Sequence, residues 1–275
     1  MTDSGADGGS ASRAPAVALA TESLSWRVGG VSIVDNVDLA VAEGEFVAVI
    51  GPNGAGKTSL FNLVSGLRGA TGGRVLLGGA EVTRLAVHRR ARLGLGRTFQ
   101  SSSVFASLTV ADNVRLAVQA HRGGSMRAWR RRTADRAVAD VADAILAQVL
   151  LGHRAGDAAG ALAHGEKRKL EIALLLAGSP KVLLLDEPMA GVSAGDVPAL
   201  VEVIRSLTAA GADAGAEPGT VPARSVLMVE HHMDVVLDLA DRVAVMHHGA
   251  MLICDTPDAV MADPTVQEAY LGEEL

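Results

Sequence analysis

Short apolar runs alternate with longer stretches of helical periodicity along most of the chain. The runs within residues 46–50, 181–186 and 225–230 hold four or five successive apolar residues, which is typical of strands buried on both faces. Helical periodicity follows them, at residues 57–67, at residues 196–209 and again from Asp234. Strands that alternate with helices predict an α/β fold with a mainly parallel sheet wrapped by helices.

Two regions depart from this alternation. Near the N-terminus, shorter strand patterns separated by glycine turns predict a small antiparallel β subdomain. Its expected strands are residues 17–26, 31–41, 74–77 and 80–82. In the middle of the chain, Thr109 is a suitable cap for helical residues 110–151, and residues 165–177 form a further apolar helix. We therefore expect an inserted helical lobe.

These patterns predict a single domain with appended segments. The first residues are small and polar without periodicity, and a later stretch has low complexity. The predicted division is a disordered leader 1–16; one domain 17–275 with its core at about 17–99 and 179–255; the lobe at about 100–178; a flexible insert at about 211–224; and a helical tail at about 256–275.

Composition narrows the class of protein. Of the 275 residues, 49% are hydrophobic, yet no apolar segment approaches the roughly 18–20 residues that cross a bilayer. The single cysteine, Cys254, forms no internal disulfide. The net charge of −6 argues against a surface that coats nucleic acid. We expect a cytoplasmic protein that binds no nucleic acid.

The stretch after the first buried strand predicts a phosphate-binding loop. Gly-x4-Gly-Lys-Thr between a strand and a helix describes a P-loop, so we expect a P-loop NTPase core. Its glycines let backbone N–H groups converge on an anion, Lys57 supplies a charge to the β- and γ-phosphates, and the Thr58 hydroxyl is suited to Mg²⁺. The nucleotide-binding residues predicted here are Gly51, Pro52, Asn53, Gly54, Ala55, Gly56, Lys57, Thr58 and Ser59.

Two acids end a later apolar strand. In a P-loop chain we interpret Asp186 as a Mg²⁺ ligand and Glu187 as the group that polarises the attacking water. Gln100 lies where the core meets the lobe, and its amide is suited to sense Mg²⁺ or the water. Taken alone, Gln100 is better interpreted as a surface glutamine.

The order of these motifs resembles the ATP-binding subunits of ABC transporters, over about residues 17–271. Residues 162–188 are similar, without a gap, to the family's stretch from the LSGGQ signature to the Walker B strand. Three further features resemble the subgroup that energises importers of branched-chain amino acids, amides and urea. They are Gly96-Arg-Thr-Phe-Gln100, Glu230-His231, and the tail from Ala262 to Gly272.

The resemblance implies a function and partners. Two ATPase subunits, identical or related, would bind ATP head to tail, and hydrolysis would drive membrane permease subunits served by a solute-binding protein. The chain would work on the inner face of the cell membrane. The signature segment Ala163, His164, Gly165 and Glu166 would cap the γ-phosphate on the other subunit. His231 would contact the γ-phosphate and position the water with Glu187.

The chain departs from the family's pattern at several positions. The signature serine is Ala163, which removes one hydroxyl donor worth about 1.5–3 kcal/mol. The aspartate after Walker B is Ser193, which also lies close enough to cap the helix from residue 196. The ring expected to stack on adenine falls at Val28, with Trp26 two residues earlier, and the sequence leaves open which of them contacts the base.

Two other classes of protein fit less well. A soluble ABC protein acting on ribosomes or DNA ends usually carries two cassettes or a long coiled coil, and this chain has one cassette and a short lobe. A P-loop kinase or GTPase would lack the segment 162–166, and no Asn/Thr-Lys-x-Asp guanine motif is present. A transport ATPase is the reading that the sequence favours.

Overall fold

The fold was described from a computed structural model of the chain. It describes residues 16–98, 104–122, 131–208 and 223–271. Gln100, nearly all of the predicted leader and most of the predicted insert lie outside these residues.

A six-stranded sheet forms the centre of the molecule, with strand order β10-β9-β3-β8-β7-β6. All neighbouring pairs are parallel except β9 and β10, which confirms the predicted mainly parallel sheet. The carboxyl ends of β3, β8, β7 and β6 therefore meet at one edge, where open α/β sheets bind ligands. The strands are β3 (Phe46–Ile50), β6 (Leu95–Arg97), β7 (Val182–Asp186), β8 (Ser225–Val229), β9 (Arg242–His247) and β10 (Ala250–Asp255).

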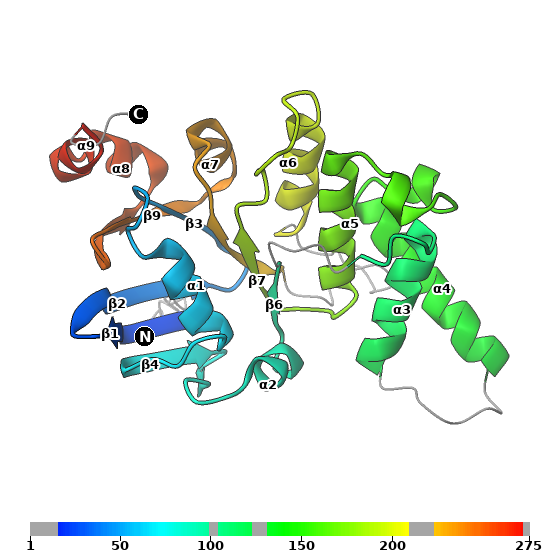
Figure 1. Ribbon diagram of the computed structural model, residues 1–275, viewed down its shortest axis with the longest axis horizontal. Helices are drawn as coiled ribbons and strands as arrows, with labels where there is room; N and C mark the ends of the chain where they lie inside the picture. The colour runs from blue at the N-terminus through cyan, green and yellow to red at the C-terminus, as the bar shows by residue number, and fades with distance from the viewer. Residues whose placement is uncertain (1–15, 99–103, 123–130, 209–222, 272–275) are drawn as a thin grey trace, which may run out of the picture.

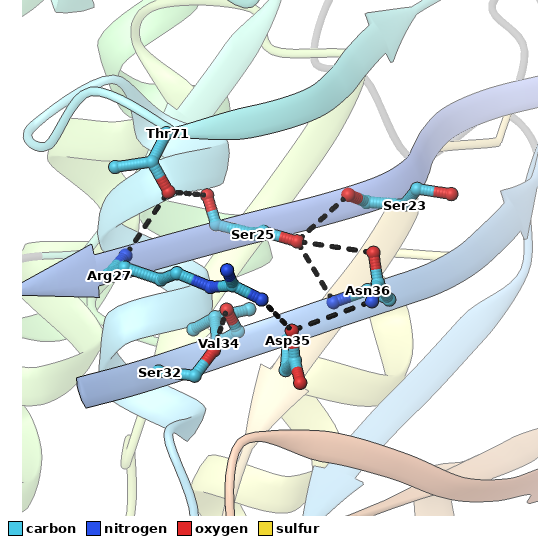
Figure 2. Close-up of polar contacts among 8 residues, drawn as sticks. All are labelled: Ser23, Ser25, Arg27, Ser32, Val34, Asp35, Asn36 and Thr71. Atoms are coloured by element: carbon cyan, nitrogen blue, oxygen red, sulfur yellow. Dashed lines mark hydrogen bonds and ion pairs between the residues drawn. The ribbon is translucent and has the colours of Figure 1, made fainter. Parts of the chain in front are cut away.

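The predicted antiparallel subdomain is a separate four-stranded sheet of order β2-β1-β4-β5, at the lower left of Figure 1. At its tip the Ser25 hydroxyl accepts the Asn36 N–H, and Thr71 bridges the backbone of Ser25 and Arg27 (Figure 2). These bonds satisfy polar groups where the β1–β2 register is irregular. The strands are β1 (Val17–Val28), β2 (Val31–Ala42), β4 (Gly72–Leu77) and β5 (Ala80–Glu81).

Two hydrophobic cores cover the two faces of the central sheet. Successive side chains of β3 alternate between them: Phe46, Ala48 and Ile50 enter one core, while Val47 and Val49 enter the other. The first core includes the lobe helices, and the second packs against α1 and the antiparallel sheet. Burial on both faces explains the continuous apolar runs in the sequence.

The helices surround this sheet, and three of them form the expected lobe on the right of Figure 1. Thr109 caps α3 as predicted, because its hydroxyl accepts the Asp112 N–H at 3.0 Å. Within the described residues, no helix has both the length and the apolar character to cross a membrane. The helices are α1 (Lys57–Ser65), α2 (Val87–Arg92), α3 (Val110–Arg122), α4 (Arg131–Gln148), α5 (His164–Leu176), α6 (Val197–Ser206), α7 (Met233–Leu239), α8 (Pro257–Ala262) and α9 (Pro264–Leu271).

Several sequence expectations were wrong in detail. Helix α1 ends at Ser65, because Gly66 adopts the left-handed conformation at its C-cap (φ 81°) and ends the helix before Gly69. Ser193 does not cap α6 with its hydroxyl, which donates to the Asp196 carboxylate at 2.8 Å. Arg224, placed in the flexible insert, is buried beside the start of β8.

Candidate active site

The loop between β3 and α1 has the geometry of an anion cradle. Gly56 precedes α1 with φ 99°, no side chain caps the helix, and no acid lies in its first turn. The first backbone N–H groups of a helix lack intrahelical acceptors, and together with the helix dipole they attract a phosphate. The side chain of Lys57 is buried in the loop, and its ammonium donates to the carbonyl oxygens of Gly51 and Pro52.

Two glycines are required by close backbone packing. A Cβ at Gly51 would lie 2.1 Å from the Met246 carbonyl oxygen, and one at Gly56 would lie 2.7 Å from the Ile33 carbonyl oxygen. Gly249 completes this packing, since it donates to the Ala55 oxygen and accepts the Asp35 N–H. The loop is thus fixed between the two sheets.

Asp186 ends β7 in a buried ion pair with Arg97 from β6. The Arg97 guanidinium donates to Asp186 Oδ2 at 2.9 Å, and it also donates to Asn62 and Ser65 of α1. Burial raises the pKa of the Asp186 carboxyl, and the charge and hydrogen bond of Arg97 oppose that rise. Arg97 therefore joins the Walker B strand to the helix that carries the P-loop.

The residues present fit a hard divalent cation. Asp186 Oδ1 is buried and has no hydrogen-bond partner among the described residues, whereas Oδ2 is held by Arg97. Thr58 in the first turn of α1 is exposed and carries a hydroxyl. Carboxylate and hydroxyl oxygens are suitable Mg²⁺ ligands, so these two residues would hold the ion.

Glu187 and His231 lie together at the same sheet edge. His231 Nε2 is 2.8 Å from Glu187 Oε1, and both side chains are partly exposed. Glu187 has φ 48°, a left-handed conformation that is uncommon for a non-glycine residue and often marks functional sites. The structure therefore brings together the two residues to which the sequence assigned the attacking water.

The two candidates for adenine stacking differ in environment. Trp26 is partly buried and packs against the core that contains Phe61, whereas Val28 at the end of β1 is 51% exposed. The hydrogen bonds in Figure 2 hold this end of β1 against Asn36 and Thr71. Stacking on adenine stays a prediction for both residues, and Val28 is the more exposed of the two.

The signature segment opens α5. Gly165 permits close packing, because a Cβ there would lie 2.8 Å from Asp196 Cβ. His164 Nε2 lies 3.3 Å from the Ala190 oxygen. Glu166 accepts the Ala163 N–H at 3.0 Å and pairs with Arg154, so its carboxylate caps its own helix. Its contact with a nucleotide on a second subunit stays a prediction.

The signature segment does not complete the P-loop of its own chain. Figure 1 shows α5 well away from α1, with β6 and β7 between them in this view. The structure brings Asp186, Glu187 and His231 to one edge of the central sheet, whereas Ala163 lies at the start of α5.

Comparison with known proteins identifies the family. Residues 34–190 match the model described as ABC transporter. The chain belongs to the ABC transporter family. Residues 254–275 of this ABC cassette match a second model, the branched-chain amino acid ATP-binding cassette transporter.

Relatives and solved structures agree with that family. The cassette is 36% identical to the high-affinity branched-chain amino acid transport ATP-binding protein BraF of Pseudomonas aeruginosa, over 93% of this chain and 98% of the relative. It is 35% identical to LivG of Escherichia coli, again over 93% and 98%. An ATP-binding cassette of an ABC transporter, solved in its ADP conformation, superimposes with a TM-score of 0.77 at 28% identity, over 94% of this chain and 99% of that one.

Two site residues were not found from sequence. Arg97 lay inside a motif noted only for its resemblance, and Glu230 only preceded His231. In each case the available signal was a charged residue at the end of a buried strand. The partner of Arg97 lies 89 residues away in the chain, and the Met189 partner of Glu230 lies 41 residues away. Such contacts depend on which strands become neighbours.

Proposed function

We propose that this cassette binds and hydrolyses ATP to energise an ABC importer, with branched-chain amino acids or related small polar solutes as cargo. The observation that carries the proposal is the Glu187–His231 pair, at 2.8 Å, on the sheet edge that also presents the P-loop and Asp186. An acid and a histidine held beside a phosphate cradle suit the activation of water for attack on a phosphoryl group.

Each side chain has a separate role in this reaction. Lys57 and the amides at the start of α1 bind the β- and γ-phosphates and fix their orientation. Glu187 accepts a hydrogen bond from the attacking water and polarises it, while His231 holds the Glu187 carboxylate in place and faces the γ-phosphate. Mg²⁺, when bound at Thr58 and Asp186, supplies positive charge that offsets the charge of the phosphates. The role of Gln100 stays a prediction.

The site is half of a shared one. Since α5 of the same chain is remote from the P-loop, a second ATPase subunit supplies the signature amides that cap the γ-phosphate. Loss of the γ-phosphate weakens this contact and lets the subunits separate. Separation is the movement that permease subunits on the inner face of the membrane would convert into transport.

An exposed aromatic residue supports a protein partner. Phe105 is 60% exposed, and the buried Asn113 side chain holds its backbone by accepting the Phe105 N–H at 2.8 Å and donating to the Phe105 oxygen at 3.1 Å. An exposed ring carried on a fixed backbone is suited to insert into an apolar pocket of another chain. The relatives named for branched-chain amino acid transport, and the matching tail at 254–275, support a permease complex and its class of cargo.

Replacement of the proposed base tests the reaction. For Glu187→Gln we expect steady-state ATP hydrolysis to fall at least about a hundredfold, because an amide does not polarise water as a carboxylate does. ATP affinity by calorimetry should stay unchanged, and an ATP-bound dimer should accumulate. Lys57→Ala should instead lose ATP affinity.

The matched control is Glu81→Gln on β5, an exposed carboxylate away from the strand ends that carry the site. It should hydrolyse ATP at the wild-type rate. Undiminished turnover in Glu187→Gln would remove the catalytic assignment, and equal ATP affinity in Lys57→Ala would contradict the phosphate-binding role of the loop.

A further inference from the structure

Glu230 is a buried carboxylate at the end of β8. Its side chain is 1% exposed. Oε1 accepts the Met189 N–H at 2.9 Å, and Oε2 accepts the His231 N–H at 2.7 Å. The exposed His232 ring lies 3.3 Å from Oε2. A buried carboxylate that accepts two backbone N–H groups fixes the position of both, because hydrogen bonds to a charged acceptor are stronger than those to a neutral one.

The two N–H groups belong to the two loops that carry the hydrolytic pair. Met189 is two residues after Glu187, and His231 is the other member of the pair. Glu187 is anchored on its other side as well, since its own N–H donates to the Val229 oxygen at 2.9 Å. The loop after β7 is thus attached to the end of β8 at both Glu187 and Met189.

This arrangement explains how Glu187 keeps its unusual backbone conformation. With φ 48° the residue is strained and persists only where its surroundings hold it. Pro188, between the two anchors, has no N–H, so the Met189 N–H is the nearest downstream group that can hold the loop. Glu230 therefore sets the separation of Glu187 from His231.

We propose that Glu230 is a positioning residue for hydrolysis, which aligns Glu187 with His231 by binding the backbone of both loops. The proposal rests on the proposed function of that pair. Glu230 touches no reacting atom in it. Its effect is confined to the hydrolytic step, and ATP binding at the P-loop does not depend on it.

The test is Glu230→Gln, which keeps the shape of the side chain but replaces one acceptor oxygen with an NH₂ donor. Either the Met189 or the His231 N–H then loses its acceptor. We expect kcat to fall about ten- to hundredfold, the range given by one hydrogen bond to a charged group. KM and the ATP affinity by calorimetry should stay within about twofold, and Glu202→Gln on the exposed face of α6 should match the wild type.

A double-mutant cycle separates positioning from general stability. If Glu230 acts through the pair, adding Glu230→Gln to His231→Ala should lower kcat little further, because the alignment is already lost. Fully additive effects, a kcat within twofold of the wild type, or a chain that fails to fold or loses ATP affinity along with kcat would overturn the proposal. Failure of the proposed function is distinguished by Glu187→Gln, which would then hydrolyse ATP normally.

Discussion

Three buried charged residues of this cassette are held by three different kinds of group. Arg97 is paired with a carboxylate, Glu230 accepts backbone N–H groups, and Arg90 donates to four backbone oxygens. Removing one member of such a set leaves the other buried and unsatisfied, which is more destabilising than the net value of the interaction. Substitutions at these residues therefore have large and separable effects.

Arg97→Met tests the ion pair at Asp186, the carboxylate proposed to bind Mg²⁺. It removes the charge beside Asp186 and leaves that carboxylate buried, so we expect the free energy of unfolding to fall by about 3–5 kcal/mol. Denaturant unfolding measures this change. Arg92→Met, at an exposed position of α2, should change it by less than about 0.5 kcal/mol. Equal stability of Arg97→Met and wild type would show that the pair with Asp186 does not hold the two strands.

At the scale of elements, whether a strand of the central sheet could be predicted from sequence depended on the burial of its two faces and on its length. The runs that became β3, β7 and β8 were recognisable because strands covered on both faces need apolar residues at every position. Strand β6 was missed, since its three residues Leu95–Arg97 form no run. The P-loop and the acids after β7 followed from local spacing.

The neighbourhood of β6 and β7 was not predictable in the same way. Thr98 lies beside β7 because β6 pairs with it in parallel, and that pairing joins residues nearly ninety positions apart. Likewise the sequence placed Trp26 and Val28 on one strand but did not indicate that Trp26 packs into a core while Val28 is exposed. Contacts of this kind follow from the order of strands and not from any local pattern.

Helix α2 holds the end of α1 through the side chain of Arg90. The buried Arg90 guanidinium donates to the oxygens of Leu63 and Val64 at the end of α1, and to those of Thr83 and Leu85. Arg90→Lys keeps a positive charge but lacks the planar set of donors, so some of these oxygens lose their bond. We expect the free energy of unfolding to fall by about 1.5–3 kcal/mol. Its matched control is the adjacent Arg89→Lys, which is exposed and should behave as wild type; an equal loss in both would assign the effect to helix propensity.

At the scale of the whole molecule, the residues of the proposed ATP site lie in two separate regions of the fold. Asp186, Glu187 and His231 lie at the sheet edge beside the P-loop, while the signature segment opens α5; α5 lies in the lobe (Figure 1). In the proposed function, one subunit therefore supplies the groups for attack on a phosphate but only half of those that enclose it. Dimerisation in the presence of ATP is the expectation that follows from this division.

Ala163→Ser tests whether the absent hydroxyl weakens that dimer. Ala163 is the N-cap of α5 with extended backbone angles (φ −63°, ψ 164°), so a serine hydroxyl there has two uses. It can cap α5 in its own subunit, for about 1 kcal/mol of stability, or donate to the γ-phosphate bound on the other subunit. In a Glu187→Gln background, we expect the dissociation constant of the ATP-bound dimer to fall about tenfold, measured by analytical ultracentrifugation.

Unfolding of the nucleotide-free monomer separates these two uses. Ala161→Ser, two residues earlier at an exposed position, should change neither quantity. If Ala163→Ser tightens the dimer and leaves monomer stability nearly constant, the hydroxyl acts across the interface. A more stable monomer with an unchanged dimer would mean that it caps its own helix and that the backbone amides of α5 already suffice for the γ-phosphate. Because Glu166 already accepts the Ala163 N–H, the capping geometry is in place, so the monomer and dimer measurements together decide between the two uses.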